Sequence, residues 1–370
     1  MRLVILLFLG MAAGFVGCKK KKPDSERPDW DKIKSATRPV VIDTGYGTPY
    51  RLDISTLGWE DGPFISPDGR TLYCFYTPLD LFSFVLNSNG DPFAIEPYLR
   101  GPFVEIVRKV PARYQGSASY FLSSDILISH RASVNDPFPP WSIAHFSTPA
   151  TFDGAPQMVL NDTNPDEAEF LLFTYLNPDP DSGNEKNDIV YYRHTSLNPD
   201  GPFQRFPAPV NEVDYQEDNP HLEIIGKDSL VLFFTNDERP GSGGIDIFFS
   251  LSNDNGRTWT SPEGVDFNSA GDEDMPFLWR DAQGAYWMYY MTPDNQIARR
   301  KQRTRGDWKH WDDAVVVLDK GNALAVGEPT LTQWGDIVFA LIYDAGKAYT
   351  TDRYDNDVWV LPRKGSPFDR

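Results

Sequence analysis

A short acidic motif recurs along this chain, and its spacing limits the fold more than any other feature of the sequence. The motif opens apolar runs that begin at Glu60, Glu167, Glu217, Glu273 and Glu328. Successive openings lie 107, 50, 56 and 55 residues apart. The first gap equals two periods, and a degenerate copy near residues 114–116 fits the missing position. A regular period of this size indicates a repeat architecture, so the sequence predicts six copies of one unit.

Each unit holds about four strand-sized segments bounded by turn residues, which is typical of an all-β fold. A second marker is the run Asp246-Ile247-Phe248. Its counterparts begin at Asp80, Trp141, Asp188, Asn295 and Asp357. Units of this length with four strands predict a six-bladed β-propeller with four-stranded blades. A β-sandwich and a β-solenoid are the competing all-β interpretations.

The two ends of the chain predict how the ring closes. Residues 38–43 form a strand-like run ahead of the first acidic opening, whereas residues 362–370 are too polar for a good last strand. We therefore expect an N-terminal strand to pair with the last blade and protect its edge. The propeller domain would span residues 39–370.

The first 17 residues read as a targeting segment. Arg2 is followed by an apolar run and then by Phe15-Val16-Gly17-Cys18. This ending resembles the lipobox of bacterial lipoproteins, with Phe15 in place of the usual Leu, and the resemblance implies lipidation of Cys18. A plain cleaved signal and an uncleaved anchor are the alternatives. Residues 18–38, with the basic run 19–22, would form a flexible tether, and the protein would be held in the bacterial envelope, facing the periplasm or the exterior.

Charge and cysteine content exclude some functions. The full chain carries a formal net charge of −18. We expect no nucleic-acid partner, because phosphate contacts need an excess of Lys and Arg. Once Cys18 is lipidated only Cys74 remains, so no internal disulfide can form, and its apolar surroundings predict a buried, inert thiol.

Two stretches resemble TolB-type propeller repeats. Residues 65–73 (ISPDGRTLY) are similar to the S-P-D-G core of those repeats, and residues 236–248 (NDERPGSGGIDIF) to their later Gly-rich hairpin. The resemblance covers about residues 40–362. It implies a propeller and, by analogy of fold alone, an envelope-assembly partner.

Residues 252–259 match the Asp-box of sialidase-type propellers at Ser252, Asp254, Gly256, Thr258 and Trp259. In this tight hairpin we expect Asp254 to accept backbone N–H bonds, Gly256 to take the left-handed conformation and Trp259 to pack beneath. The resemblance implies a folding element on the outer rim and no sialidase chemistry.

The acidic openings also supply the candidate site. In a propeller they would lie at the start of the innermost strands, near the central channel. The candidates for channel or ligand binding are Glu60, Asp61, Glu217, Asp218, His221, Glu273, Asp274 and Glu328. Converging carboxylates would raise one another's pKa values, and a pair about 5–10 Å apart could cleave a glycosidic bond. Recurrence in every unit instead favours a structural role, in which each acid bonds the neighbouring blade.

His221 stands where other units have Phe, which is more typical of a buried core histidine than of a ligand. The sequence contains no metal-ligand spacing, nucleophile elbow or phosphate loop. We therefore predict no resident metal or cofactor, with calcium in the Asp-rich turns left open, and lean against an enzyme. The leading function is a recognition or scaffold module for an envelope protein or a glycan. The alternative is a hydrolase of sialidase or glycosidase type.

Overall fold

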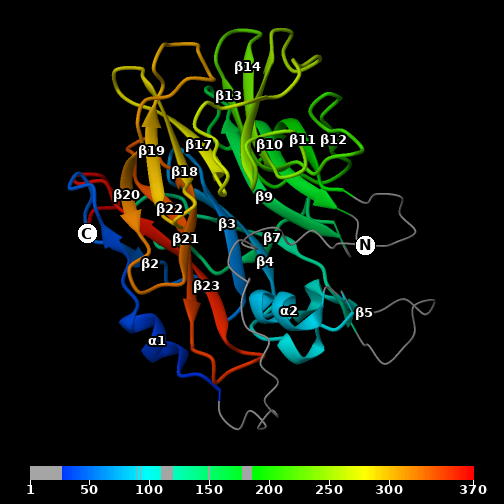
Figure 1. Ribbon diagram of the computed structural model, residues 1–370, viewed down its shortest axis with the longest axis vertical. Coiled ribbons are helices and arrows are strands. Elements are labelled where there is room, and N and C mark those ends of the chain that lie inside the picture. The colour runs from blue at the N-terminus through cyan, green and yellow to red at the C-terminus, as the bar shows by residue number, and fades with distance from the viewer. Residues whose placement is uncertain (1–26, 90, 92, 110–119, 149–150, 177–185) are drawn as a thin grey trace.

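A computed structural model describes residues 27–89, 91, 93–109, 120–148, 151–176 and 186–370, and the statements below concern these residues. Their main strands form antiparallel four-stranded units that follow one another around a centre in chain order (Figure 1). The chain is therefore a β-propeller, as the strand pattern predicts.

Each blade runs from an innermost strand outwards in four strands. Blade 1 is β3 (Trp59–Ile65), β4 (Thr71–Thr77), β7 (Asp125–His130) and β8 (Ser142–Ile143). Blade 2 is β9 (Phe152–Leu160), β10 (Glu167–Leu176), β11 (Asp188–Ser196) and β12 (Gln204–Arg205). Blade 3 is β13 (Asp218–Ile224), β14 (Leu230–Asn236), β15 (Asp246–Ser252) and β16 (Glu263–Gly264). Blade 4 is β17 (Asp274–Arg280), β18 (Tyr286–Met291), β19 (Ile297–Lys301) and β20 (Val315–Asp319). Blade 5 is β21 (Ala325–Leu331), β22 (Ile337–Asp344), β23 (Tyr354–Leu361) and β2 (Tyr50–Arg51).

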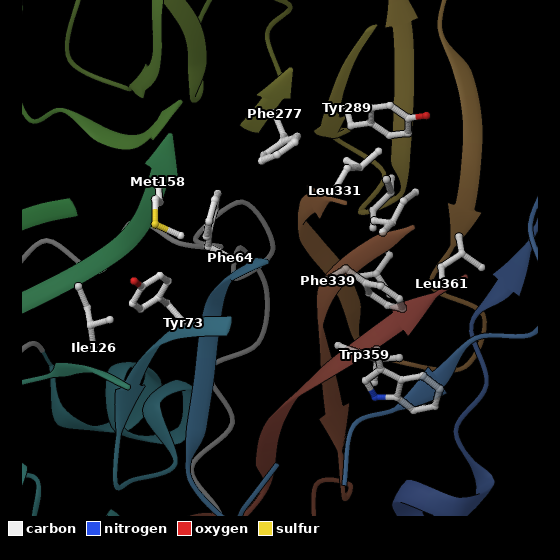
Figure 2. Close-up of a cluster of buried hydrophobic side chains, with 14 of the residues drawn as sticks. Phe64, Tyr73, Ile126, Met158, Phe277, Tyr289, Leu331, Phe339, Trp359 and Leu361 are labelled. Carbon is white, nitrogen blue, oxygen red and sulfur yellow. The ribbon is translucent and has the colours of Figure 1, made fainter. Parts of the chain in front are cut away.

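The innermost strands β3, β9, β13, β17 and β21 pack against one another around the centre. Apolar side chains from all the blades fill the space between neighbouring sheets. Figure 2 shows part of this core, with Phe64 lying between Met158 on one side and Phe277 on the other. The Phe64 and Phe277 rings are 6.4 Å apart between centroids. Burial of these large side chains is the main favourable term that holds the blades together.

The predicted count of six blades is wrong for the described part of the chain, which forms five. The long first gap holds an insertion between β4 and β7 instead of a further blade. It contains α2 (Leu81–Ser88), η2 (Glu96–Tyr98), η3 (Val104–Ile106), β5 (Arg108–Lys109) and β6 (Tyr120–Phe121). The degenerate copy expected near residues 114–116 lies outside the described residues.

Two of the predicted strand markers belong to other elements. Asp80 caps helix α2, because its side chain accepts a hydrogen bond from the Ser83 N–H at 2.9 Å. The marker at Trp141 leads into β8, the outermost strand of blade 1. A period read from sequence alone does not separate an insertion from a degenerate repeat.

An N-terminal strand does complete the last blade, although it is not the one expected. β2 pairs with β23, with Tyr50 opposite Val360. The predicted residues 38–43 instead contribute β1 (Val40–Val41), which adds a fifth strand to blade 4 by pairing with β20. β23 also pairs in parallel with β3 at Asn356 and Trp59, so the first and last blades form one eight-stranded sheet.

The expected tether, residues 18–38, is folded from residue 27 onwards. Helix α1 (Trp30–Ala36) begins at Asp29, whose side chain accepts from the Lys32 N–H at 3.1 Å. The ammonium of Lys34 is buried between Asp355, at 2.5 Å, and Asp357, at 2.8 Å. Burial of an ion pair ties this helix to blade 5. Cys18 lies outside the described residues, and none of the described helices could cross a membrane.

The Asp-box forms the predicted hairpin between β15 and β16. Asp254 accepts hydrogen bonds from the N–H of Thr258 (2.9 Å), the hydroxyl of Thr258 (2.6 Å) and the hydroxyl of Ser252 (2.9 Å). These bonds, the Thr258 hydroxyl first, lower the pKa of Asp254 to about 2. Gly256 has a φ of 85°, and the Trp259 indole donates to its carbonyl at 3.1 Å.

Candidate functional site

The same backbone irregularity occurs in every innermost strand. A residue with positive φ stands directly before a proline in each: Gly62 (51°), Ala155 (43°), Asn219 (48°), Met275 (59°) and Glu328 (56°). Each lies at a shift in register with the second strand of its blade. A bulge of this kind bends the strand and redirects its side chains.

The bulges build the wall of a cavity on the propeller axis. Each innermost strand contributes the positive-φ residue, the proline and the residue after it, and together these triplets enclose about 40 Å³. The lining residues are Gly62 to Phe64, Ala155 to Gln157, Asn219 to His221, Met275 to Phe277 and Glu328 to Thr330. A cavity of this size holds about three water molecules.

The first acid of each predicted pair forms hydrogen bonds or an ion pair with residues outside the cavity. Glu60 accepts from the N–H of Thr56 at 2.8 Å and from its hydroxyl at 2.5 Å. Glu273 makes the same two bonds to Ser269, at 2.7 and 2.6 Å. Glu217 instead forms an ion pair with Arg239 at 2.7 Å. These three carboxyls fix the loops that lead into β3, β17 and β13.

The second acids gather at the channel together with Glu328. Burial raises the pKa of Asp218 to about 7 and that of Asp274 to about 6, and the negative charge of Asp274 contributes to the shift of Asp218. Asn219 links the two, because its side-chain amide donates to Asp274 at 2.9 Å and its backbone N–H donates to Asp218 at 2.9 Å. Asp218 is partly exposed, whereas Asp274 is buried.

Asp61 and Glu328 form a carboxyl pair on the other side of the channel. Burial first, and then the charge of Asp61, hold the pKa of Glu328 well above its usual range. Glu328 accepts a hydrogen bond from the N–H of Gly62. Asp61 accepts from the side-chain amide of Asn356 at 2.8 Å and from the indole of Trp59 at 2.9 Å. Two acids in contact do not both ionise readily, which favours the protonated form of Glu328.

His221 lines the cavity. Its ring is 4.4 Å from that of Phe277 between centroids, and burial lowers its pKa to about 3. The imidazole is therefore neutral. Neither ring nitrogen has a hydrogen-bond partner among the residues that the structure describes.

The sequence prediction missed the contribution of blade 2. Asp166 and Glu167 lie at or before the start of β10, the second strand, and Asp166 pairs with Arg70 at 3.1 Å on the surface. The equivalent acid is Asp153 in β9, which accepts from the Thr148 N–H at 2.6 Å. An acid three residues before a proline marks four of the innermost strands: Glu60 and Pro63, Asp153 and Pro156, Glu217 and Pro220, Glu273 and Pro276. The same spacing also occurs at Asp136 and Pro139 and at Asp162 and Pro165, so it would have narrowed the candidates for β9 without locating it.

The described residues contain no group of three or more His, Cys, Asp or Glu side chains placed to bind a metal ion. Cys74 is buried in β4, and burial raises the pKa of its thiol well above the usual value, which keeps it unreactive. The expectation of no resident metal or cofactor, with calcium left open, stays a prediction.

No protein-family model and no curated protein matches the chain. Solved structures similar to it include a thermostable family-43 glycoside hydrolase, with 12% identity, a TM-score of 0.49, and coverage of 87% of this chain and 99% of that one. A protein of unknown function from Dyadobacter fermentans has 11% identity and a TM-score of 0.48, over 88% of this chain and 99% of that one. An α-L-arabinofuranosidase from Podospora anserina has 11% identity and a TM-score of 0.45, over 89% and 98%. Likenesses this distant assign no activity to the chain.

Proposed function

We propose that this protein is a carbohydrate-active hydrolase that cleaves glycosidic bonds with the carboxyls at its channel mouth. The observation that carries the proposal is the gathering of carboxyls at the channel, where Glu328 lies against Asp61 and Asn219 links Asp218 to Asp274. Burial holds the pKa of Glu328 well above its usual range and raises that of Asp218 to about 7. Glycoside hydrolysis needs one protonated and one ionised carboxyl on opposite sides of the bond.

In the proposed reaction Glu328 is the general acid and donates its proton to the leaving glycosidic oxygen. Asp218 is the partly exposed member of the cluster, and in the proposed reaction its carboxylate acts on water or on the sugar. It either takes a proton from the attacking water or itself attacks the sugar carbon and is later released by water. The configuration of the product distinguishes these two courses.

In the proposed complex the sugar ring lies over the five triplets that line the cavity, with one substituent entering it.

The test is an activity screen of the full chain against aryl glycosides and plant and bacterial polysaccharides. We expect kcat/KM to rise with pH through about 7, as Asp218 loses its proton, and to fall at higher pH as Glu328 loses its own. Glu328→Gln should abolish turnover, while the matched control Glu273→Gln, in a loop-fixing position, should retain it. Absence of turnover on every substrate, or full activity in Glu328→Gln, would overturn the proposal.

A recognition module, the leading interpretation of the sequence, is the second candidate. A protein or glycan bound across the channel face would not need to enter the channel. The TolB-like envelope-assembly role belongs to this class and rests on analogy of fold alone. Binding that persists in Glu328→Gln and Asp218→Asn, without turnover in the unmodified protein, would support it.

The envelope address is a separate proposal. Cys18 at the end of the lipobox-like segment would carry the lipid and hold the propeller on the membrane of the bacterial envelope. Metabolic labelling with a radioactive fatty acid tests it. Label in the unmodified protein and none in Cys18→Ser is the expected result, and equal label in both would exclude lipidation at this residue.

A further inference from the structure

Asp61 is held by two neutral N–H donors, one for each carboxylate oxygen. The Asn356 amide donates to Oδ1 at 2.8 Å, and the Trp59 indole donates to Oδ2 at 2.9 Å. Asp61, Asn356 and Trp59 are all nearly fully buried. The amide oxygen of Asn356 has no hydrogen-bond partner among the described residues, so the hydrogen bond found for its side chain goes to Asp61. Among the described residues, the Asn356 side chain therefore bonds to Asp61.

These donors act on one member of the carboxyl pair. A hydrogen bond from a neutral donor to a carboxylate stabilises the ionised form over the protonated one. Glu328 has a different set of contacts, because its carboxyl accepts from the N–H of Gly62 and lies against Asp61. Two donors on Asp61 against one on Glu328 favour the charge on Asp61 and the proton on Glu328.

We propose that Asn356 and Trp59 are positioning residues that keep Asp61 ionised and thereby keep the shared proton on Glu328. Asn356 lies on β23 of the last blade and Asp61 on β3 of the first, where these strands meet in parallel. The protonation of Glu328 is therefore set by contacts across the junction between two blades. A catalytic use for this proton rests on the proposed function, but its location does not.

Other titratable groups face the pair. Asp274 on β17 acts on Glu328, and Asp218 on β13 and Cys74 on β4 feel the charge of Asp61. Glu60, the neighbour of Asp61 in β3, is buried. Its pKa is raised first by burial and then by the negative charge of Asp357. None of these is a cation, so none offers Asp61 the stabilisation that the two N–H donors give.

The experiment is a carbon-13 NMR titration of the full chain labelled at glutamate side-chain carboxyls, with Glu328 assigned from the signal lost in Glu328→Gln. In the unmodified protein the Glu328 signal should remain that of a protonated carboxyl through pH 7. In Asn356→Leu, which removes the donor and keeps the shape, the titration should move down by about one pH unit or more. The matched control is Asn236→Leu, since Asn236 is also buried but donates to the Gln216 carbonyl.

Trp59→Phe is the second variant, because it removes the other donor and keeps an aromatic ring should Asn356→Leu fail to fold. It should shift Glu328 in the same direction. An unchanged Glu328 titration in either folded variant, or an ionised Glu328 in the unmodified protein below pH 7, would overturn the inference. The titration needs no substrate, so it stands even if the hydrolase screen fails. Where turnover is found, the upper pH limb of kcat/KM should move by the same amount.

Discussion

Adjacent acids in the same strand have different surroundings in this propeller. Glu60 and Glu273 each bind the backbone and hydroxyl of a Ser or Thr four residues earlier, whereas Asp61 and Asp274 lie at the channel. Neighbouring side chains in a β-strand point to opposite faces, so two like residues in sequence need not share a role. Recurrence in each unit therefore indicates structure for the first acid of a pair and does not settle the role of the second.

The largest expected effect compares two neighbours at the start of β13, Glu217 just before the strand and Asp218 at its first position. Asp218→Asn should lower kcat/KM by about 10²–10⁴-fold, because it removes the base of the proposed reaction. Glu217→Gln should lower it far less, since Glu217 binds Arg239 away from the mouth. Steady-state kinetics of the two variants measure this, and equal losses would mean that the neighbours do not differ in role.

The next effect is on stability and its pH dependence. The folded-state pKa of Asp218, about 7, lies above its ordinary value of 3.8. Between these values the folded protein binds more protons than the unfolded chain, so this group's contribution to stability is full below about pH 4 and is lost as the pH rises through about 7. Asp218→Asn removes that loss. We expect it to raise the free energy of unfolding by about 2 kcal/mol at pH 8, allowing for the partial exposure of the side chain, and by little at pH 4.

Urea denaturation at the two pH values is the measurement. If the variant is destabilised at pH 8, or if it differs from the unmodified protein by the same amount at both pH values, the ionised Asp218 side chain does not destabilise the fold. The same substitution is expected to lower activity, because a residue that serves catalysis often destabilises the folded state.

A smaller effect is expected for the first acids. Glu273→Ala leaves the N–H and hydroxyl of Ser269 without their acceptor, so the free energy of unfolding should fall by about 1.5 kcal/mol. Activity per folded molecule should be unchanged. Chemical denaturation and kinetics on one preparation test both statements, and a stable but inactive Glu273→Ala would place this acid in the site.

The smallest effect concerns the backbone beneath both sets of acids. Gly62 has a φ of 51°, and an added Cβ would meet Ala155 only at 3.5 Å, an ordinary contact. Gly62→Ala should therefore lower the free energy of unfolding by about 1 kcal/mol, through the cost of a left-handed alanine and not through a clash. Ala155, already left-handed at 43°, shows that the position accepts a Cβ. A loss several times larger would mean that Gly62 is needed for the approach of Glu328.

The sequence predicted the strands but not the number of blades. The run from Leu230 to Phe234 is fully apolar and forms the buried strand β14, and the Asp-box residues predict the observed hairpin. The blade count failed because the insertion from β4 to β7 has the length of a repeat. Asp153 was missed because it stands alone, without a second acid beside it.

The direction of each candidate side chain could not be predicted because it depends on the bulges. Asn219 and Glu328 each have a positive φ and stand directly before a proline, and this conformation turns their side chains toward the axis. The pattern of acidic residues in the sequence does not predict a backbone angle. The partners of Asp61 come from different strands, since Trp59 is two residues away and Asn356 is 295 residues away. Contacts of the second kind exist only once the ring has closed.

The closure of the ring also means that the propeller has no inherent first blade. β2 near the start of the folded chain lies on β23 near its end, and the guanidinium of Arg370 lies 4.3 Å from the ring of Tyr50. Tyr50 and Arg370 are therefore neighbours in space, but the folded chain begins at residue 27, so a peptide that joins the ends has to reach α1 and not β2. A circularly permuted gene opened instead at the loop around Val213, whose side chain is 90% exposed, would encode the same five blades in a new order.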